Sequence, residues 1–164
     1  MRKLTLLAAF FCFAVSISVN AQSADDTKAV RGVIDSLFAE MAASNPPAIV
    51  KLQMPESQIV AVARGKDGKN TVHYYSAEAF SKFFTKKDAN IEEMMYAPKT
   101  AIDGDVAMYW GRYVFFVDGK ISHCGLNTFH LVRTEGVWKI ANAASTIDPT
   151  NCTKKEKAMK PTRQ

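Results

Sequence analysis

The spacing of apolar residues predicts helices in the first part of the chain and short strands after them. Between residues 25 and 43, apolar side chains recur every three to four positions, as in an amphipathic helix. Pro46 and Pro47 stop this pattern, and a short second helix is expected over 46–53. Strands are expected over 57–64 and 71–75, around an Asp-Gly turn, and Ser76 is placed to cap a third helix.

The second half of the chain alternates in the manner of β-strands. Strands are expected over 91–102, 106–117, 120–133 and 137–147, and each connection contains a Gly after Asp or Glu. Such turns join antiparallel neighbours and define their register. Helices followed by a meander predict an α+β fold, in which one curved antiparallel sheet wraps over the N-terminal helices.

The turns also predict which side chains share a face. If the last two turns are two-residue loops, Trp110 lies opposite Asn127 and His123 lies opposite Asp148. One face then mixes apolar and polar groups, as a ligand pocket or a core with satisfied polar residues would. Its expected members are Met108, Trp110, Arg112, His123, Asn127, Phe129, Trp138, Ile140 and Asn142.

The opposite face is expected to be rich in aromatic residues. Its expected members are Tyr109, Tyr113, Phe115, Cys124, Leu126 and Thr128. Such a face is either partly exposed or covered by a second subunit, and its aromatic density favours a homodimer formed through the sheet.

The N-terminus has the features of a secretory signal. Two basic residues precede an apolar run over 4–19, and the run closes on Val19-Asn20-Ala21. We therefore expect residues 1–21 to be a signal peptide and the protein to be exported, periplasmic or secreted, from a bacterium. An uncleaved N-terminal anchor is the alternative, although the run is short for a membrane span. No stable membrane insertion of the domain is expected.

Export bears on the cysteines. Cys12 lies in the signal, which leaves Cys124 and Cys152 in the mature chain. An even pair in an oxidising compartment favours a disulfide. The alternative is a buried free thiol at Cys124 and an exposed one at Cys152.

The formal charge of +5 is concentrated at the two ends of the chain. Loss of Arg2 and Lys3 leaves +3, and residues 153–164 hold five basic residues and one acidic residue, a charge of +4. The domain over 22–152 is therefore close to neutral, at −1. This distribution gives no support for nucleic-acid binding, and residues 153–164 are expected to be a basic, disordered tail.

One stretch carries a resemblance to a known superfamily. It comprises Asp118-Gly119-Lys120, then His123-Cys124-Gly125-x-Asn127-x-Phe129, then Trp138-Lys139-Ile140, with a cysteine about a dozen residues later. The chain resembles exported bacterial proteins of the nuclear-transport-factor-2-like (NTF2-like, cystatin-like) superfamily, in the group labelled lumazine-binding. Ser145-Thr146 stands where members carry Asp-Thr, and nothing in the sequence identifies a pteridine site. The resemblance implies a cone-shaped α+β roll enclosing a pocket, often in a homodimer.

Three functions are compatible with these residues. The first is an exported, non-catalytic protein that holds a small organic, anionic ligand. Its expected ligand-binding residues are Trp110, Arg112, His123, Asn127 and Phe129. The anion is inferred from Arg112, because a buried guanidinium needs a carboxylate or phosphate partner, either from a ligand or from the chain itself.

The second function is a small-molecule isomerase or dehydratase. Ketosteroid isomerase, scytalone dehydratase and polyketide cyclases share the implied fold and use acid–base groups inside the cone. His123, with Asp148 at the rim, is the candidate pair here. The third function is a protein-interaction or dimerisation domain with a filled cone. No metal-ligand spacing and no phosphate loop occurs, so no metal or cofactor is expected.

Overall fold

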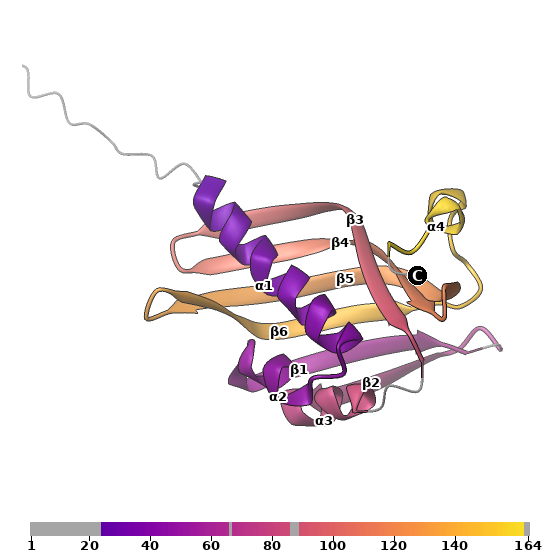
Figure 1. Ribbon diagram of the computed structural model, residues 1–164, viewed down its shortest axis with the longest axis horizontal. Helices are drawn as coiled ribbons and strands as arrows, with labels where there is room; N and C mark the ends of the chain where they lie inside the picture. The colour runs from indigo at the N-terminus through magenta and orange to yellow at the C-terminus, as the bar shows by residue number, and fades with distance from the viewer. Residues whose placement is uncertain (1–23, 66, 86–88, 163–164) are drawn as a thin grey trace, which may run out of the picture.

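The computed structural model describes residues 24–65, 67–85 and 89–162, which form a curved sheet with the N-terminal helices on its concave side (Figure 1). The predicted signal peptide lies outside the described residues. No helix within the described ranges is long and apolar enough to cross a membrane. The helical elements are α1 (Ala24–Ala42), α2 (Pro46–Lys51), α3 (Ala77–Ser81), the 3-10 turn η1 (Lys82–Phe84) and α4 (Lys154–Ala158). The strands are β1 (Gln53–Arg64), β2 (Asn70–Ser76), β3 (Ile91–Asp103), β4 (Val106–Val117), β5 (Lys120–Thr134) and β6 (Val137–Ile147).

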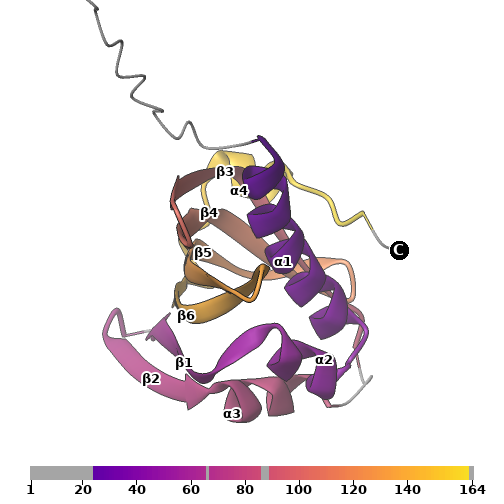
Figure 2. The ribbon, with the colours of Figure 1, turned by 90° about the vertical axis from the view of Figure 1, so that its left-hand side faces the viewer.

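The six strands form one sheet in the order β2-β1-β6-β5-β4-β3. Neighbouring strands are antiparallel except β1 and β6, which run parallel. The sheet curls around α1, while α2 and α3 lie at the end near β1 and β2 (Figure 2). The predicted α+β class is confirmed, and the parallel pair is a difference from the purely antiparallel sheet expected.

Helix α1 packs on the concave face through one apolar stripe. Val30, Ile34, Leu37 and Met41 are buried at helical spacing and belong to the main core. Burying each such side chain contributes about 1.5–3 kcal/mol. The stripe therefore fixes the helix across the sheet and forms one wall of the interior.

Two β-bulges correct the predicted register. The Asp118-Gly119 turn forms as expected, with both residues at positive φ (49° and 74°). Phe116 then pairs with Ile121, but Phe115 pairs with His123, so the strands slip by one residue. The predicted pairing of Trp110 with Asn127 is therefore wrong, because Trp110 pairs with Thr128.

A second shift affects β6. The pairing of β5 with β6 slips by one residue between Leu131, which pairs with Ile140, and His130, which pairs with Asn142. At the end of the sheet, Cys124 and not His123 therefore lies opposite Asp148. Because side chains alternate along a strand, the first shift moves the side chains of β4 residues 106–115 to the opposite face from the one predicted.

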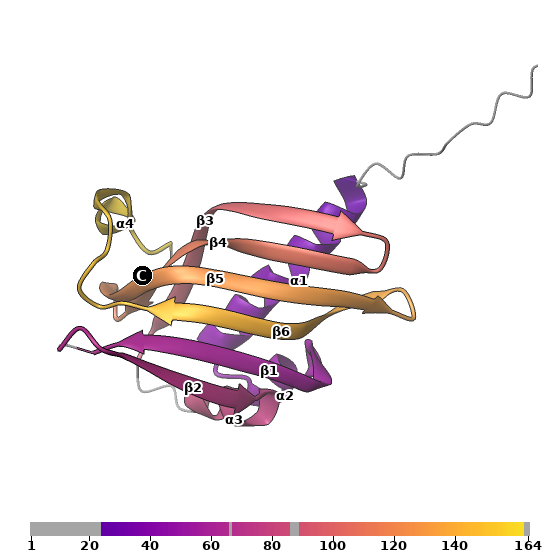
Figure 3. The same cartoon turned by 180° about the vertical axis from the view of Figure 1, so that it is seen from behind.

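As a result, Tyr109, Tyr113 and Phe115 face the interior, where they join the core or line the cavity. Trp110 and Arg112 alternate with them and lie on the outer face, which Figure 3 shows from behind. The aromatic face expected to form a dimer interface is thus largely an inner wall, and that basis for a dimer is wrong.

The C-terminal segment was expected to be a disordered tail, but it contains the short helix α4 (Lys154–Ala158). Cys124 and Cys152 form a disulfide, which confirms the predicted pairing. Beyond it, Thr153 and Glu156 form a capping box at the start of α4. The Glu156 side chain is fully buried and accepts hydrogen bonds from Arg112, so the anion that Arg112 requires is an internal carboxylate.

Candidate functional site

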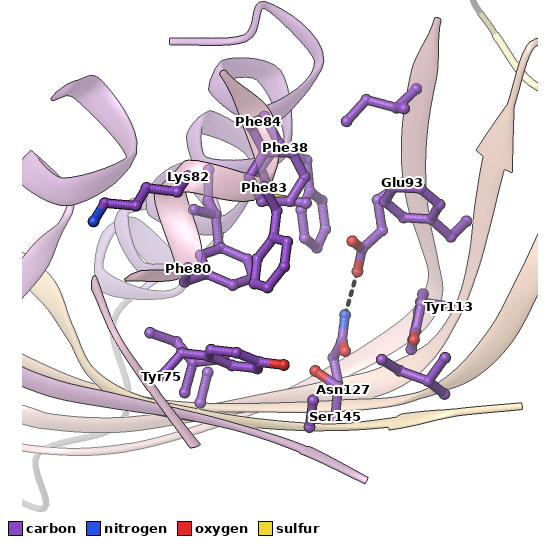
Figure 4. Close-up of a pocket in the computed structure, with 18 of the residues that line it drawn as sticks. Phe38, Tyr75, Phe80, Lys82, Phe83, Phe84, Glu93, Tyr113, Asn127 and Ser145 are labelled. Atoms are coloured by element: carbon purple, nitrogen blue, oxygen red, sulfur yellow. Dashed lines mark hydrogen bonds between the residues drawn. The ribbon is translucent and has the colours of Figure 1, made fainter. Parts of the chain in front are cut away.

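The concave side of the sheet encloses a cavity of about 820 Å³. All six strands contribute to one side of it, and α1, α3 and η1 contribute to the other (Figure 4). Its walls are mainly apolar, as in typical small-molecule sites. The principal lining residues are Phe38, Met41, Ile59, Tyr75, Phe80, Lys82, Phe83, Phe84, Glu93, Tyr113, Phe115, His123, Asn127, Phe129, Ile140, Ala143 and Ser145.

Aromatic rings form much of the wall and contact one another. The rings of Phe38 and Phe129 meet edge to face, with centroids 6.3 Å apart. Those of Tyr75 and Phe83 meet in the same way at 5.1 Å. Edge-to-face packing is favourable for aromatic pairs. These contacts help to fix the orientation of the rings, which line the hollow with their faces and edges.

The cavity opens beside η1. Phe83 lines the cavity, yet its side chain is 63% exposed. Lys82 and Thr85 are likewise exposed to solvent and also line the cavity. A ligand would enter past these residues, with Lys82 as the charged group at the opening.

The most unusual group on the wall is the carboxyl of Glu93 on β3. Asn127 on β5 donates its side-chain amide to Glu93 Oε1 at 2.5 Å. Protein atoms surround the carboxyl, and its partial exposure is to the hollow that it faces. Burial raises the pKa of Glu93 to about 7, although the hydrogen bond from Asn127 acts in the opposite direction. Near neutral pH this group can therefore hold or release a proton.

Tyr113 on β4 lies close to this pair. Its hydroxyl donates to the carbonyl oxygen of Thr146 at 2.9 Å. Burial raises the pKa of Tyr113, and the negative charge of Glu93 adds to the increase. Gly125 makes the arrangement possible, because a Cβ there would lie 2.8 Å from the Tyr113 ring and 1.8 Å from the Thr146 carbonyl oxygen. Tyr113 therefore stays protonated and braces the wall.

His123 on β5 lies against aromatic rings. Its ring stacks on Phe115 with centroids 4.8 Å apart and meets Tyr113 edge to face at 5.8 Å. Ser122 Oγ lies 3.2 Å from Nδ1. Burial lowers the pKa of His123 to about 4, so its ring is neutral at physiological pH.

The structure separates the predicted site residues into two groups. His123, Asn127 and Phe129 line the cavity, as expected. Trp110 and Arg112 lie on the outer face and do not line it, because the bulge in β5 reverses β4. Their predicted place in the pocket is therefore wrong.

Asp148 lies at the end of β6 and has local partners. Its carboxylate accepts hydrogen bonds from Thr150 and Asn151, and Arg64 Nε is 3.9 Å away. The Asn151 side chain makes the largest contribution to holding the pKa of Asp148 well below its usual range. Among the described residues no hydrogen bond or ion pair joins Asp148 to His123, so the expected placement of the two as a couple is wrong.

Sequence analysis missed Glu93 and Tyr113. A usable signal was present: Ile91, Glu93 and Met95 alternate along a strand, so a carboxylate falls between two apolar residues on one face. No such signal existed for Tyr113, because the bulge in β5 determines the face of the sheet to which its side chain projects.

One group of potential metal ligands was found within the described residues. It comprises Cys124, Cys152 and Glu156, whose ligand atoms lie within 4.8 Å of one another. The two sulfurs form a disulfide, and the Glu156 carboxylate forms an ion pair with Arg112. Because no thiolate is free to bind a metal, the cluster is unsuited to a metal and instead stabilises the C-terminal segment.

No family model matches the sequence, and no curated protein matches it. Solved structures do match in fold. A protein described as a calcium/calmodulin-dependent protein kinase II association domain from Xanthomonas campestris is 22% identical, with a TM-score of 0.61 over 80% of this chain and 93% of its own. An NTF2-like protein with a cystatin-like fold from Novosphingobium aromaticivorans is 12% identical, with a TM-score of 0.63 over 82% and 88%.

A third similar structure, from the same organism, is described as the β subunit of an aromatic-ring-hydroxylating dioxygenase. It is 14% identical, with a TM-score of 0.61 over 77% of this chain and 91% of its own. At these identities the likeness shows the fold: the chain has the NTF2-like, cystatin-like α+β fold. The lumazine-binding group label remains a prediction.

Proposed function

We propose that this protein is an exported binding protein that holds a small organic molecule inside the cone. The observation that carries the proposal is the hollow interior itself. Its aromatic wall would bury an apolar body, and Glu93, Asn127 and Tyr75 would orient it through hydrogen bonds. A filled interior would have favoured the interaction-domain alternative instead.

The anionic ligand expected from Arg112 loses its support. Arg112 is engaged by Glu156 on the outer face. Among the described lining residues, Lys82 at the opening is the one cationic side chain, whereas Glu93 lies inside. The proposed ligand is therefore largely apolar and is not an anion.

A matched pair of variants tests this function. Ala143 is buried on the cavity wall, whereas its neighbour Ala144 projects to the outer face. We expect Ala143→Phe to weaken the binding of Nile red, a neutral apolar dye, by at least tenfold in a fluorescence titration, and Ala144→Phe to leave it within about twofold. Equal binding by both variants would show that the hollow is not the binding site.

Export and dimerisation belong to the same proposal. Export is supported by the signal-like residues 1–21 and by the disulfide, which persists in oxidising compartments. A homodimer through the sheet is supported by exposed apolar side chains on the outer face, among them Met108 and Leu126. Light scattering of the mature protein tests the dimer, and Met108→Glu should yield monomer.

Acid–base catalysis is the second candidate, as an isomerase or dehydratase. One observation favours it: Glu93 has a pKa of about 7 and faces the space that a substrate would occupy. Glu93 is better suited than His123 to exchange protons at neutral pH, because a pKa of about 4 makes His123 a weak base. If the protein is an enzyme, Glu93→Gln should abolish turnover while the Nile red affinity stays within about threefold.

A further inference from the structure

We propose that the ligand carries a protonated amine that pairs with Glu93 at the inner wall of the cone. This inference rests on the ligand-binding function proposed above and specifies the chemical class of the ligand. It starts from a charge that the chain itself does not balance. Within the described ranges, the hydrogen bond from Asn127 is the one polar contact of the Glu93 carboxyl, and no lysine, arginine or histidine forms an ion pair with it.

An ionised carboxylate away from bulk water is costly without a positive partner. The contrast with Glu156 is informative, because that carboxylate is also buried but is paired with Arg112 at 2.7 Å. Glu93 is enclosed by protein except where it faces the hollow, and it has no such partner among the described residues. A cation from outside the chain would supply the charge that is missing.

The hydrogen-bonding groups around Glu93 favour a donor. A carboxylate accepts hydrogen bonds and does not donate them, so Asn127 must turn its NH₂ group toward Glu93. The carbonyl oxygen of the same amide is then left as an acceptor. In Figure 4 the hydroxyl of Tyr75 points into the hollow toward this pair. An ammonium group has three donors and no acceptor, which matches these oxygens.

The aromatic wall fits the same class of ligand. Figure 4 shows Phe38 and Phe83 across the hollow from the Glu93 carboxyl. Ring faces attract cations, and rings also cover an apolar body efficiently. An amine attached to an aromatic or aliphatic ring system therefore meets favourable contacts at both ends.

The other charged groups nearby do not reverse this preference. Tyr113 and His123, on β4 and β5, are neutral at physiological pH. Asp35 on α1 and Glu92 on β3 border a smaller hollow that also reaches Glu93, but Asp35 is paired with Arg31 and Glu92 accepts hydrogen bonds from Thr162. Lys82 lies at the opening, and its side chain extends away from Glu93 in Figure 4. An anionic head group at the inner wall would meet repulsion.

The test uses three fluorescent probes that share one ring system: pyrenemethylamine, pyrenemethanol and pyrenecarboxylic acid. Titration of the mature protein at pH 8, where Glu93 is ionised, should give tightest binding to the amine. We expect an advantage of at least tenfold over the alcohol, with the acid weakest. Glu93→Gln should reduce the amine's advantage to about threefold or less, while Glu56→Gln, at an exposed carboxylate on β1, should preserve it.

The ranking on the wild-type protein decides the proposal even if the Glu93 variant does not fold. Equal affinity for amine and alcohol would overturn the amine proposal and leave the binding function standing. The same conclusion follows if Nile red binds but none of the three pyrenes does. Failure of Nile red and all three pyrenes to bind would overturn both proposals.

Discussion

Replacing Glu93 with glutamine should make the folded protein more stable at alkaline pH. Glutamine has nearly the same shape and can keep one hydrogen bond with Asn127, but it carries no charge to be desolvated. The raised pKa of Glu93 means that the folded state holds its proton more tightly than the unfolded chain does. The stability associated with this proton is fully present below the ordinary pKa of 4.5 and is lost as the pH rises through about 7.

The size of the effect follows from these two pKa values. A pKa of about 7 against an ordinary value of 4.5 corresponds to about 3 kcal/mol in the free energy of unfolding at pH 8. Solvent screening reduces this figure, because Glu93 is partly exposed to the cavity. We therefore expect the stability difference between Glu93→Gln and wild type to grow by about 2 kcal/mol between pH 5 and pH 8, in favour of the variant.

The assay is urea unfolding at a series of pH values, and the variant must be compared with wild type at each of them. His123 makes this necessary, because its pKa is lowered to about 4. Its contribution to stability is present above its ordinary pKa of 6.5 and is lost as the pH falls through about 4, which opposes the trend from Glu93. The difference between the two proteins removes the contribution of His123.

The control is Glu56→Gln, whose difference from wild type should stay flat across the same pH range, because Glu56 is exposed. A flat difference for Glu93→Gln as well would refute the reasoning. That result would mean that the carboxyl is solvated as freely in the folded state as in the unfolded chain.

Four further predictions concern stability. Replacing both Cys124 and Cys152 with serine should lower the free energy of unfolding by about 3–4 kcal/mol, which is the loop-entropy value for their separation of 28 residues. Urea unfolding measures this loss, and an unchanged urea midpoint would contradict the prediction. Gly125→Ala should prevent folding or cost more than about 3 kcal/mol, because its Cβ would clash with a β6 carbonyl. Gly32→Ala, where the added Cβ meets open space on α1, should instead stabilise the protein by up to about 1 kcal/mol, and urea unfolding measures both glycine variants. Glu156→Gln should cost about 1–3 kcal/mol by unpairing a partly exposed guanidinium, and a neutral outcome in urea would show that the pair contributes no stability.

The element boundaries were largely predictable because their signals are local. Strand β4 begins and ends, and β6 begins, where the turns placed them. Ser76 caps α3 by accepting a hydrogen bond from the backbone N–H of Ala79. A turn or a cap needs a few adjacent residues in a particular conformation, and those residues are visible in the sequence.

The contents of the site were only partly predictable, because bulges depend on how a curved sheet closes over a helix. One extra residue near Ser122 moved Tyr113 inside and Arg112 outside. The position of α4 followed from that reversal, since Glu156 is buried against an arginine that faces outward. Neither outcome has a local sequence signal, whereas Glu93 did have one in the alternation along β3.

The parallel pairing of β1 with β6 has a consequence for how the chain matures. Val60 on β1 pairs with Ala144 on β6, so the first strand meets its partner only after the last strand has been made. The β1–β2 hairpin and the meander of β3–β5 are joined in the sheet by β6 alone. Contacts this distant in sequence form slowly. A nascent chain therefore cannot close the sheet, and the hollow is complete only once the whole domain has been synthesised and folded.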